Sequence, residues 1–305
     1  MIEILGKTNI DFMGKRKIAF MFSGIMVALG ILAMVQIARG AANLGIDFAG
    51  GTAVQLKFDR PIRTDEARAA LERNHLAGAE IQEFVSENKL LIRVKEATTI
   101  EEKVADRVVA IFGKEFPDRK LEVEASTEIG PTIGHKLQED ALIAILISFA
   151  GIILYIAARF EFRFGVAAAV STFHDVLAVL GLFYVLDKEV TLLVVTALLT
   201  LAGYSLTDTV VVFDRIRENL RVRRRDGLET IINNGINQVL SRTIVTSLTV
   251  VLVLVPLTLA GGEVLHDFSL ALLCGVIVGT YSSIFVASPL LVIWPGGTGK
   301  LLKKG

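Results

Sequence analysis

TLAGYSLTDTVVVFDRIREN, residues 200–219, starts inside a long apolar segment and ends in a run of charged residues. Asp208 lies in the apolar part, with Tyr204, Ser205, Thr207 and Thr209 around it. A carboxylate at membrane depth costs about 2.5–3.5 kcal/mol on insertion scales unless it is paired or faces water. Asp208 is therefore a candidate functional residue, and a structural hydrogen-bonding group between helices is the alternative.

The composition indicates a membrane protein. The chain has 305 residues, 52% of them hydrophobic, and a mean hydropathy of +0.58. Lys+Arg and Asp+Glu both total 32, so the net charge points to no partner, nucleic acid included. Cys274 is the only cysteine, which excludes a disulfide within the chain, and no Cys/His spacing typical of a metal site is present. The sequence predicts neither a metal nor a cofactor.

Six apolar segments are long enough to cross a membrane as helices. The first is followed by small residues, so a cleaved signal peptide is its alternative. That segment is longer than the usual apolar region of a signal peptide, and the later spans need it for their orientation. We therefore predict six transmembrane helices at 18–37, 141–158, 165–186, 191–213, 243–259 and 268–294.

Residues 40–136 have a different character, with many charges and short alternating runs. Thr64 is placed to cap a helix, and Glu101 and Glu102 suit the first turn of another. Strands are predicted at 52–58, 80–85, 89–94 and 121–127, and helices at 64–74 and 99–112. The order βαββαβ is the ferredoxin-like split arrangement, so an α+β domain is predicted between the first two spans.

The charges between the spans predict the orientation. Arg159 and Arg163 share one connection, six arginines lie within 215–225, and Lys300, Lys303 and Lys304 close the chain. The connections on the opposite side carry a single lysine. The positive-inside rule therefore places both termini in the cytoplasm and the α+β domain outside, on the periplasmic or extracellular face.

Two surface segments are also predicted. Residues 1–17 are short and mixed and suit the membrane surface, and apolar residues at helical spacing in 228–240 suggest an amphipathic helix lying along it.

Three of the predicted spans carry ionisable residues. His174 and Asp175 lie in the third span, and Arg242 opens the fifth. Because the fourth and fifth spans are joined on the cytoplasmic side, Asp208 and Arg242 can approach in depth, and such a pair could take up and release a proton. The alternatives are a snorkelling cation for Arg242 and an interhelical hydrogen-bond pair for His174–Asp175.

Small residues mark two further places. Gly275, Gly279 and Ser283 recur every four residues in the last span, which permits close packing within the chain or against a partner. GIDFAGGT, residues 45–52, joins the first span to the α+β domain, and its glycine pair suits an unusual backbone turn. A phosphate loop is the weaker interpretation, because a strand and not a helix follows.

Several segments, in order, resemble the SecF family of the bacterial protein-export machinery. They are IDFMGKRK before the first span, LGIDFAGGT after it, HDV in the third, GYSLTDTVVVFDRIREN in the fourth and SRTIVTSLT opening the fifth. The resemblance covers nearly the whole chain. One departure is Thr207, where the family usually has asparagine.

The resemblance implies a proton-driven device of the resistance–nodulation–division superfamily that is not an enzyme. It implies a complex with SecD that uses the proton motive force to help preproteins through the Sec channel (SecY, SecE and SecG), possible association with YajC, and residence in the bacterial inner membrane. The family's proton-path residues fall on Asp208 and Arg242, with His174 and Asp175 matching a further motif. Motif or hinge positions fall on Gly45, Asp47, Gly50, Gly51, Tyr204 and Thr209.

The resulting prediction is an α-helical polytopic membrane protein with one inserted α+β ferredoxin-like periplasmic domain. The expected boundaries are 1–38 for the N-terminus and first helix, 39–137 for the periplasmic domain, 138–296 for helices two to six, and 297–305 for the tail. The rival functions are a small-molecule or lipid exporter of the same superfamily and a passive scaffold of the Sec channel. The exporter would predict larger external domains and a drug-sized apolar pocket, so the single external domain of roughly a hundred residues argues against it.

Overall fold

The computed structural model describes residues 8–76, 78–84, 87–95, 103–222 and 226–294. It divides into two compact units. The helical unit comprises Met1–Asn43, Ala144–Lys188 and Leu193–Gly305, and the α/β unit comprises Leu44–Ile143 and Glu189–Leu192. The lysines at 300, 303 and 304 and the arginines at 223–225, which contribute to the orientation argument, lie outside the described residues.

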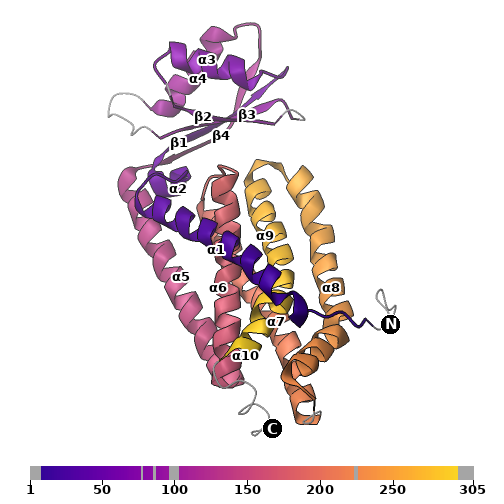
Figure 1. The fold of residues 1–305 in the computed structure, drawn as a ribbon. Helices are drawn as coiled ribbons and strands as arrows, with labels where there is room; N and C mark the ends of the chain where they lie inside the picture. The colour runs from indigo at the N-terminus through magenta and orange to yellow at the C-terminus, as the bar shows by residue number, and fades with distance from the viewer. Residues whose placement is uncertain (1–7, 77, 85–86, 96–102, 223–225, 295–305) are drawn as a thin grey trace. The chain divides into compact units, whose positions relative to one another are not determined.

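Six helical segments among the described residues are long and apolar enough to cross a membrane, which confirms the predicted number. The sixth is interrupted: α9 passes into a π-helical turn, Ser283–Ala287, before α10. The helices that make up these six segments, labelled in Figure 1, are α1 (Arg16–Ala38), α5 (Pro131–Arg159), α6 (Phe162–Val185), α7 (Leu192–Val222), α8 (Leu228–Ala260), α9 (Gly262–Ser282) and α10 (Ser288–Ile293).

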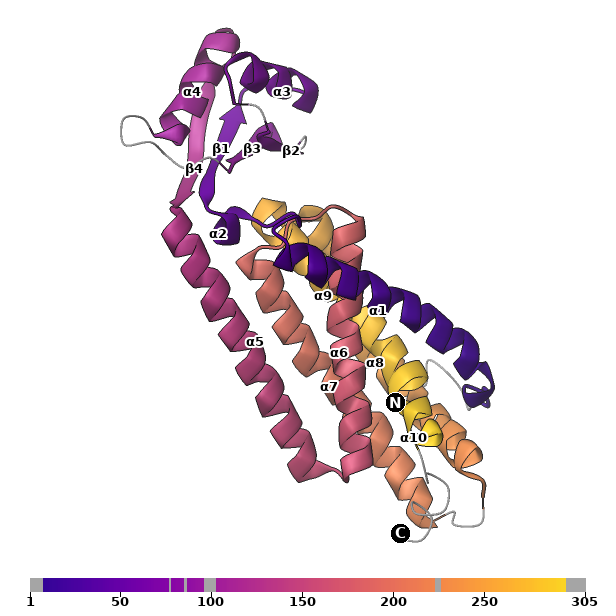
Figure 2. The same ribbon diagram turned by 60° about the vertical axis from the view of Figure 1, so that its left-hand side comes forward.

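Helices α6, α7 and α9 form the buried centre of the helical unit, whereas α1 is largely exposed. In α6, in α7 and in the α9–α10 segment, at least half of the residues in the most apolar 18-residue stretch are buried. In the first span the corresponding share is 22%. Helix α1 crosses α6 obliquely in both views (Figures 1 and 2). At the crossing, Gly30 lies against the backbone of Leu177, and a Cβ on Gly181 would lie 2.7 Å from the Gly30 nitrogen. Only glycine permits this approach.

The segment 228–240 is not a separate surface helix, so that prediction is wrong. It is the first part of the continuous helix α8. Ile231, Ile232 and Ile236 are fully buried in a cluster that includes Ile216 and Leu220 of α7. The apolar stripe predicted from the sequence is present, but helix α7 covers it instead of lipid.

Part of the N-terminal segment also packs against protein, contrary to the predicted surface position. A short 3₁₀ turn, Met13–Lys15, precedes α1, and Phe12 and Met13 are buried. Asn233 Oδ1 on α8 accepts hydrogen bonds from the backbone nitrogens of Phe12 and Met13, both at 3.0 Å. Asn237 bonds to the backbone nitrogen and oxygen of Ile10, both at 2.9 Å. Two asparagines thus fix the chain before α1.

The α/β unit has the predicted order of elements. Its antiparallel sheet runs β2-β3-β1-β4. Apolar side chains of β1 and β3, among them Val54, Leu56 and Ile92, form its core with α3 and α4. The elements are β1 (Gly51–Phe58), α3 (Thr64–Arg73), β2 (Glu80–Phe84), β3 (Lys89–Val94), α4 (Val104–Glu115) and β4 (Leu121–Ile129).

The predicted helix starts differ from the observed ones. Arg63 occupies the N-cap position of α3 without a capping hydrogen bond from its side chain, and the Thr64 hydroxyl donates to Glu83 Oε2 at 2.8 Å instead of capping the helix. The expected start of the second helix, with Glu101 and Glu102, lies outside the described residues, and the described helix α4 begins at Val104.

The glycine pair has the unusual backbone that the sequence predicts. Gly50 and Gly51 have φ values of 75° and 131°, in the region that favours glycine. The one-turn helix α2, Ile46–Ala49, precedes them, and Gly51 starts β1. Within the same unit, the Gly45 nitrogen donates to Val190 O at 3.0 Å, and Asp47 Oδ2 accepts from the Leu192 nitrogen at 2.9 Å. Gly45 and Asp47 therefore hold the connection between α6 and α7.

A pair of carboxyl groups, the buried Glu189 and the half-buried Glu80, lies at the same connection. Glu189 is 6% exposed, its Oε2 lies 3.2 Å from Arg93 Nε, and it faces Glu80, which pairs with Lys95 at 2.8 Å. Burial, together with the facing Glu80 carboxyl, raises the pKa of Glu189 to about 8. A proton on Glu189 allows it to donate to Glu80, so the pair holds one proton near neutral pH.

The first prediction concerns the α1–α6 crossing. Gly30→Leu should lower the free energy of unfolding by about 1–3 kcal/mol or more, because the added side chain has no room beside Leu177. Gly24→Leu is the matched control on the same helix, where a Cβ meets nothing within 4 Å. Thermal unfolding of both purified variants in detergent measures the effect. Equal stability would contradict a close crossing at Gly30.

The second prediction concerns pH. Because the folded-state pKa of Glu189 lies above its ordinary value of 4.5, the stability that this proton contributes is complete below about pH 4.5 and is lost as pH rises through about 8. Hydrogen-exchange protection of β2 and of residues 189–192 should fall between pH 6 and pH 9. Arg93 and Lys95 moderate the fall, since both carry positive charge beside the pair. Glu189→Gln keeps a donor but cannot ionise, so it should remove most of this pH dependence. An unchanged profile would refute the assignment.

Candidate functional site

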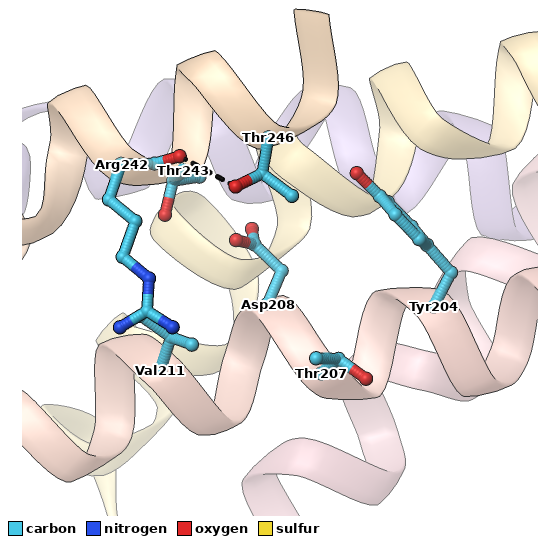
Figure 3. Close-up of a pocket in the computed structure, with 7 residues that line it drawn as sticks. All are labelled: Tyr204, Thr207, Asp208, Val211, Arg242, Thr243 and Thr246. Atoms are coloured by element: carbon cyan, nitrogen blue, oxygen red, sulfur yellow. Dashed lines mark hydrogen bonds between the residues drawn. The ribbon is translucent and has the colours of Figure 1, made fainter. Parts of the chain in front are cut away.

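Asp208 lies at a small pocket between α7 and α8. The pocket has a volume of about 80 Å³, enough for water, and is lined by Tyr204, Thr207, Asp208, Val211, Arg242, Thr243 and Thr246 (Figure 3). The Asp208 side chain points into it and is 9% exposed. Its Oδ2 accepts a hydrogen bond of 2.8 Å from Ser283 Oγ. The carboxylate is therefore buried, anchored on one side and open to the pocket on the other.

Arg242 reaches the same pocket from α8 without an ion pair. Figure 3 shows its side chain extending from α8 toward Val211 on α7, beside Asp208. Within the part of the chain that the structure describes, no carboxylate oxygen lies within 4 Å of the Arg242 guanidinium. The sequence prediction that the two residues can approach in depth is thus met by a shared pocket, with the two charges not in contact.

The hydroxyls around Asp208 fall into two kinds. Those of Thr207 and Thr246 donate to carbonyls of their own helices, Gly203 at 3.1 Å and Arg242 at 2.9 Å. Those of Thr209 and Thr243 are buried and have no hydrogen-bond partner among the described residues. The second kind leaves polar atoms available inside an apolar bundle.

His174 and Asp175 form a second buried polar centre, which α6 places against α7 and α9. His174 Nδ1 lies 2.8 Å from Asp175 Oδ1. Asp175 Oδ2 accepts hydrogen bonds from Ser205 on α7 and from Ser282 on α9, the latter at 2.7 Å. Asp175 is fully buried, and His174 Nε2 has no hydrogen-bond partner among the described residues. These contacts agree with the interpretation of Asp175 as a hydrogen-bonding group between helices.

The residues that join the two centres are ones that the sequence analysis assigned to packing or overlooked. Ser282 and Ser283 are neighbours, and they bond Asp175 and Asp208 respectively. The small-residue stripe does pack within the chain: Gly275 lies against Leu201, and a Cβ on Gly279 would lie 3.2 Å from the Ser205 Cβ. Ser283, the third member of that stripe, binds the carboxylate. In the sequence, the feature that could have pointed to these residues is the pair of adjacent serines within an apolar run.

A π-helical turn starts at Ser283. The Ser288 hydroxyl donates to Ser283 O at 2.8 Å, and Pro289 follows near the start of α10. Proline has no N–H and its ring crowds the carbonyl four residues earlier, so it kinks or interrupts a regular helix. Such π turns often occur at functional sites.

Among the described residues, no group of three His, Cys, Asp or Glu side chains could hold a metal ion.

Comparison with known proteins identifies the class of this chain. Residues 110–296 match the family described as "Protein export membrane protein SecD/SecF, C-terminal", and residues 42–62 match the "SecD/SecF GG Motif". The chain is 52% identical to the protein translocase subunit SecF of Thermodesulfovibrio yellowstonii over the full length of both chains. It is 39% identical to that of Vibrio alginolyticus, covering 95% of this chain and 91% of the relative.

Solved structures agree with the sequence comparison. SecDF of Thermus thermophilus, titled a translocon-associated membrane protein, superposes with a TM-score of 0.79 at 36% identity, covering 94% of this chain. A SecDF structure in the super-membrane-facing form gives 0.69 at 37% identity, covering 95% of this chain. The chain spans 39% of the length of either SecDF chain. This chain is a multi-pass membrane protein and belongs to the SecF family.

Proposed function

We propose that this chain is an accessory subunit of the Sec protein translocase and acts in a complex with a SecD protein. Full-length relatives carry the name of a translocase subunit, and the solved SecDF chains contain further sequence beyond the part that this chain matches. A separate SecD chain would supply that part. The exposed apolar faces of α1 and α5 are available to lipid or to this partner.

We propose that the complex uses the proton motive force, and that Asp208 carries the proton. The observation that supports this most directly is the buried Asp208 carboxylate at a water-sized pocket, facing an arginine with which it does not pair. Desolvation favours the protonated carboxyl, and an approaching guanidinium favours the ionised one. A change in the separation between Asp208 and Arg242 would therefore bind or release a proton.

The energy available suits a conformational switch. One elementary charge that crosses 100 mV supplies about 2.3 kcal/mol. This energy changes the equilibrium constant between two states by a factor of roughly a few tens. Proton passage at Asp208 and Arg242, with His174 and Asp175 as a second station, would bias the helical unit between two arrangements. The α/β unit would act on the preprotein as it leaves the Sec channel, formed by SecY, SecE and SecG, with YajC as a further proposed partner.

This proposal sets the location of each part. The protein would lie in the bacterial inner membrane with both termini in the cytoplasm and the α/β unit in the periplasm, as the positive-inside rule predicts.

The third prediction tests the proton step. Asp208→Asn keeps the shape of the side chain but cannot ionise, so gradient-dependent preprotein export in vesicles that hold the channel, SecD and this chain should be lost while assembly with SecD is kept. Asp214→Asn is the matched control: Asp214 is another carboxylate of α7, but it is exposed and paired with Arg159 at 2.9 Å. Arg242→Lys keeps the charge and should retain part of the activity.

Two outcomes would count against the proton step. Wild-type gradient dependence in Asp208→Asn, at normal assembly, would leave a passive scaffold as the better account. An equal loss in Asp214→Asn would show that the effect is not specific to the buried carboxylate.

The fourth prediction tests the orientation. Single cysteines at Asp118 and Glu161, both exposed, are introduced into a Cys274→Ser background, which has no other cysteine. In intact spheroplasts an impermeant thiol reagent should label Asp118→Cys, in the α/β unit, and should label Glu161→Cys, between α5 and α6, only after lysis. The reverse pattern would invert the topology and remove a periplasmic role for the α/β unit.

A further inference from the structure

We infer that Ser282 and Ser283 act as a pair of hydroxyl switches that allow Asp175 and Asp208 to change protonation state inside the helical unit. Both serines are positioning residues, because they act through the carboxylates. The inference rests on the proton coupling proposed above. It adds two residues and a physical requirement: a buried carboxylate must keep a hydrogen-bond partner both with and without its proton.

Each hydroxyl lies between a carboxylate and a helix carbonyl. Ser283 Oγ is 2.8 Å from Asp208 Oδ2 and 3.0 Å from Thr280 O. Ser282 Oγ is 2.7 Å from Asp175 Oδ2 and 3.1 Å from Gly279 O. Both serines are fully buried, so no bulk water competes for these bonds. The same geometry thus occurs at both carboxylates, with the carbonyl three residues earlier as the second acceptor each time.

This geometry suits both charge states. When Asp208 is ionised, the Ser283 hydroxyl donates to Oδ2. When a proton binds Oδ2, the Ser283 hydroxyl turns to donate to Thr280 O, and its oxygen accepts the new O–H of Asp208. Asp208 gains one proton and Ser283 keeps its own. No buried donor or acceptor of this pair loses its partner in either state, which avoids the cost of an unsatisfied polar group.

The same exchange is available at Asp175, with more partners. Ser282 can turn from Asp175 to Gly279 O, and Ser205 provides a further hydroxyl on Asp175 Oδ2. If Nδ1 of His174 carries the proton and donates to Asp175, Nε2 is the atom that can accept another. Among the described residues, the ionisable groups that face the two carboxylates are Arg242 on α8 and Tyr204 on α7 at the pocket, and His174 on α6.

Adjacent positions on one helix connect the two exchanges. A rotation or shift of the segment that carries Ser282 and Ser283 would change both carboxylate contacts together. The π turn that begins at Ser283 is the element whose hydrogen bonding departs from that of a regular helix. Protonation at Asp208 is thereby linked to the Asp175–His174 pair through two neighbouring hydroxyls.

The fifth prediction tests this pair in the full complex with SecD and the channel. Ser282→Ala and Ser283→Ala remove one hydroxyl each with little change in shape, and gradient-dependent export should fall about tenfold in either variant. Ser269→Ala is the matched control, because Ser269 is also a fully buried serine of α9 but bonds only to backbone carbonyls, Leu265 O and His266 O. Gradient-independent export should stay unchanged in all three.

Infrared difference spectra between low and high pH give a readout that a purely structural role would not move. The carbonyl band of protonated Asp208 is assigned by its absence in Asp208→Asn. Ser283→Ala should shift that band, because the carboxylic acid loses its hydrogen-bond partner, whereas Ser282→Ala should shift the Asp175 band and Ser269→Ala should shift neither.

The inference and the proposed function can fail separately. If Asp208→Asn keeps gradient-dependent export, the proposed function is wrong and this inference with it. If Asp208→Asn loses it but both serine variants keep wild-type export and wild-type bands, only the serine switch is wrong. Should one serine variant fail to assemble with SecD, the other tests the same arrangement at the other carboxylate.

Discussion

The structure depends on the burial of two carboxylates inside a bundle of apolar helices. Asp175 is fully buried and Asp208 nearly so. An unpaired charge in such surroundings is costly enough that it either finds donors or takes a proton. The donors come from three helices: α6 supplies His174, α7 supplies Ser205, and the α9 segment supplies Ser282 and Ser283. Helices α6, α7 and α9 must therefore face one another where the carboxylates lie, because the donors come from all three.

The two carboxylates are satisfied to different degrees, and the difference assigns their roles. Asp175 has hydrogen bonds with three side chains and does not line the pocket at Asp208. Asp208 has one such bond, from Ser283, and borders the cavity that Arg242 also lines. The partners of Asp175 come from three helices and satisfy its buried oxygens. Asp208, with a single hydroxyl bond and a water-sized pocket beside it, is therefore the site of proton entry in the proposal, and Asp175 with His174 is the second station behind it.

The sequence predicts what depends on local pattern and misses what depends on neighbours. The six spans follow directly from apolar length, and the βαββαβ order follows from the alternation and the turns. The stripe at Ile231, Ile232 and Ile236 looks the same whether lipid or α7 covers it, so its burial could not be inferred. The short connection that holds Glu189 gives no sign of its partner Arg93, almost a hundred residues earlier in the chain. Asp208 and Arg242 were found because a charge in an apolar run stands out, whereas a serine in the same run does not.

The position of the serine pair can be traced back to the sequence through Pro289. Proline cannot donate to the carbonyl four residues before it, which is that of Phe285, and its ring crowds that carbonyl. The helix accommodates this by widening into the π turn Ser283–Ala287, and the Ser288 hydroxyl bonds to Ser283 O. The regular helix α9 therefore ends at Ser282, and the wider turn begins at the residue that binds Asp208. A widened turn has fewer ideal backbone hydrogen bonds than an α-helix, so its side chains contribute more to holding it in place. The bonds from Ser282 and Ser283 to the two carboxylates are among those contributions, and a change in the charge of Asp208 acts on the part of the helix that is least fixed by its own backbone.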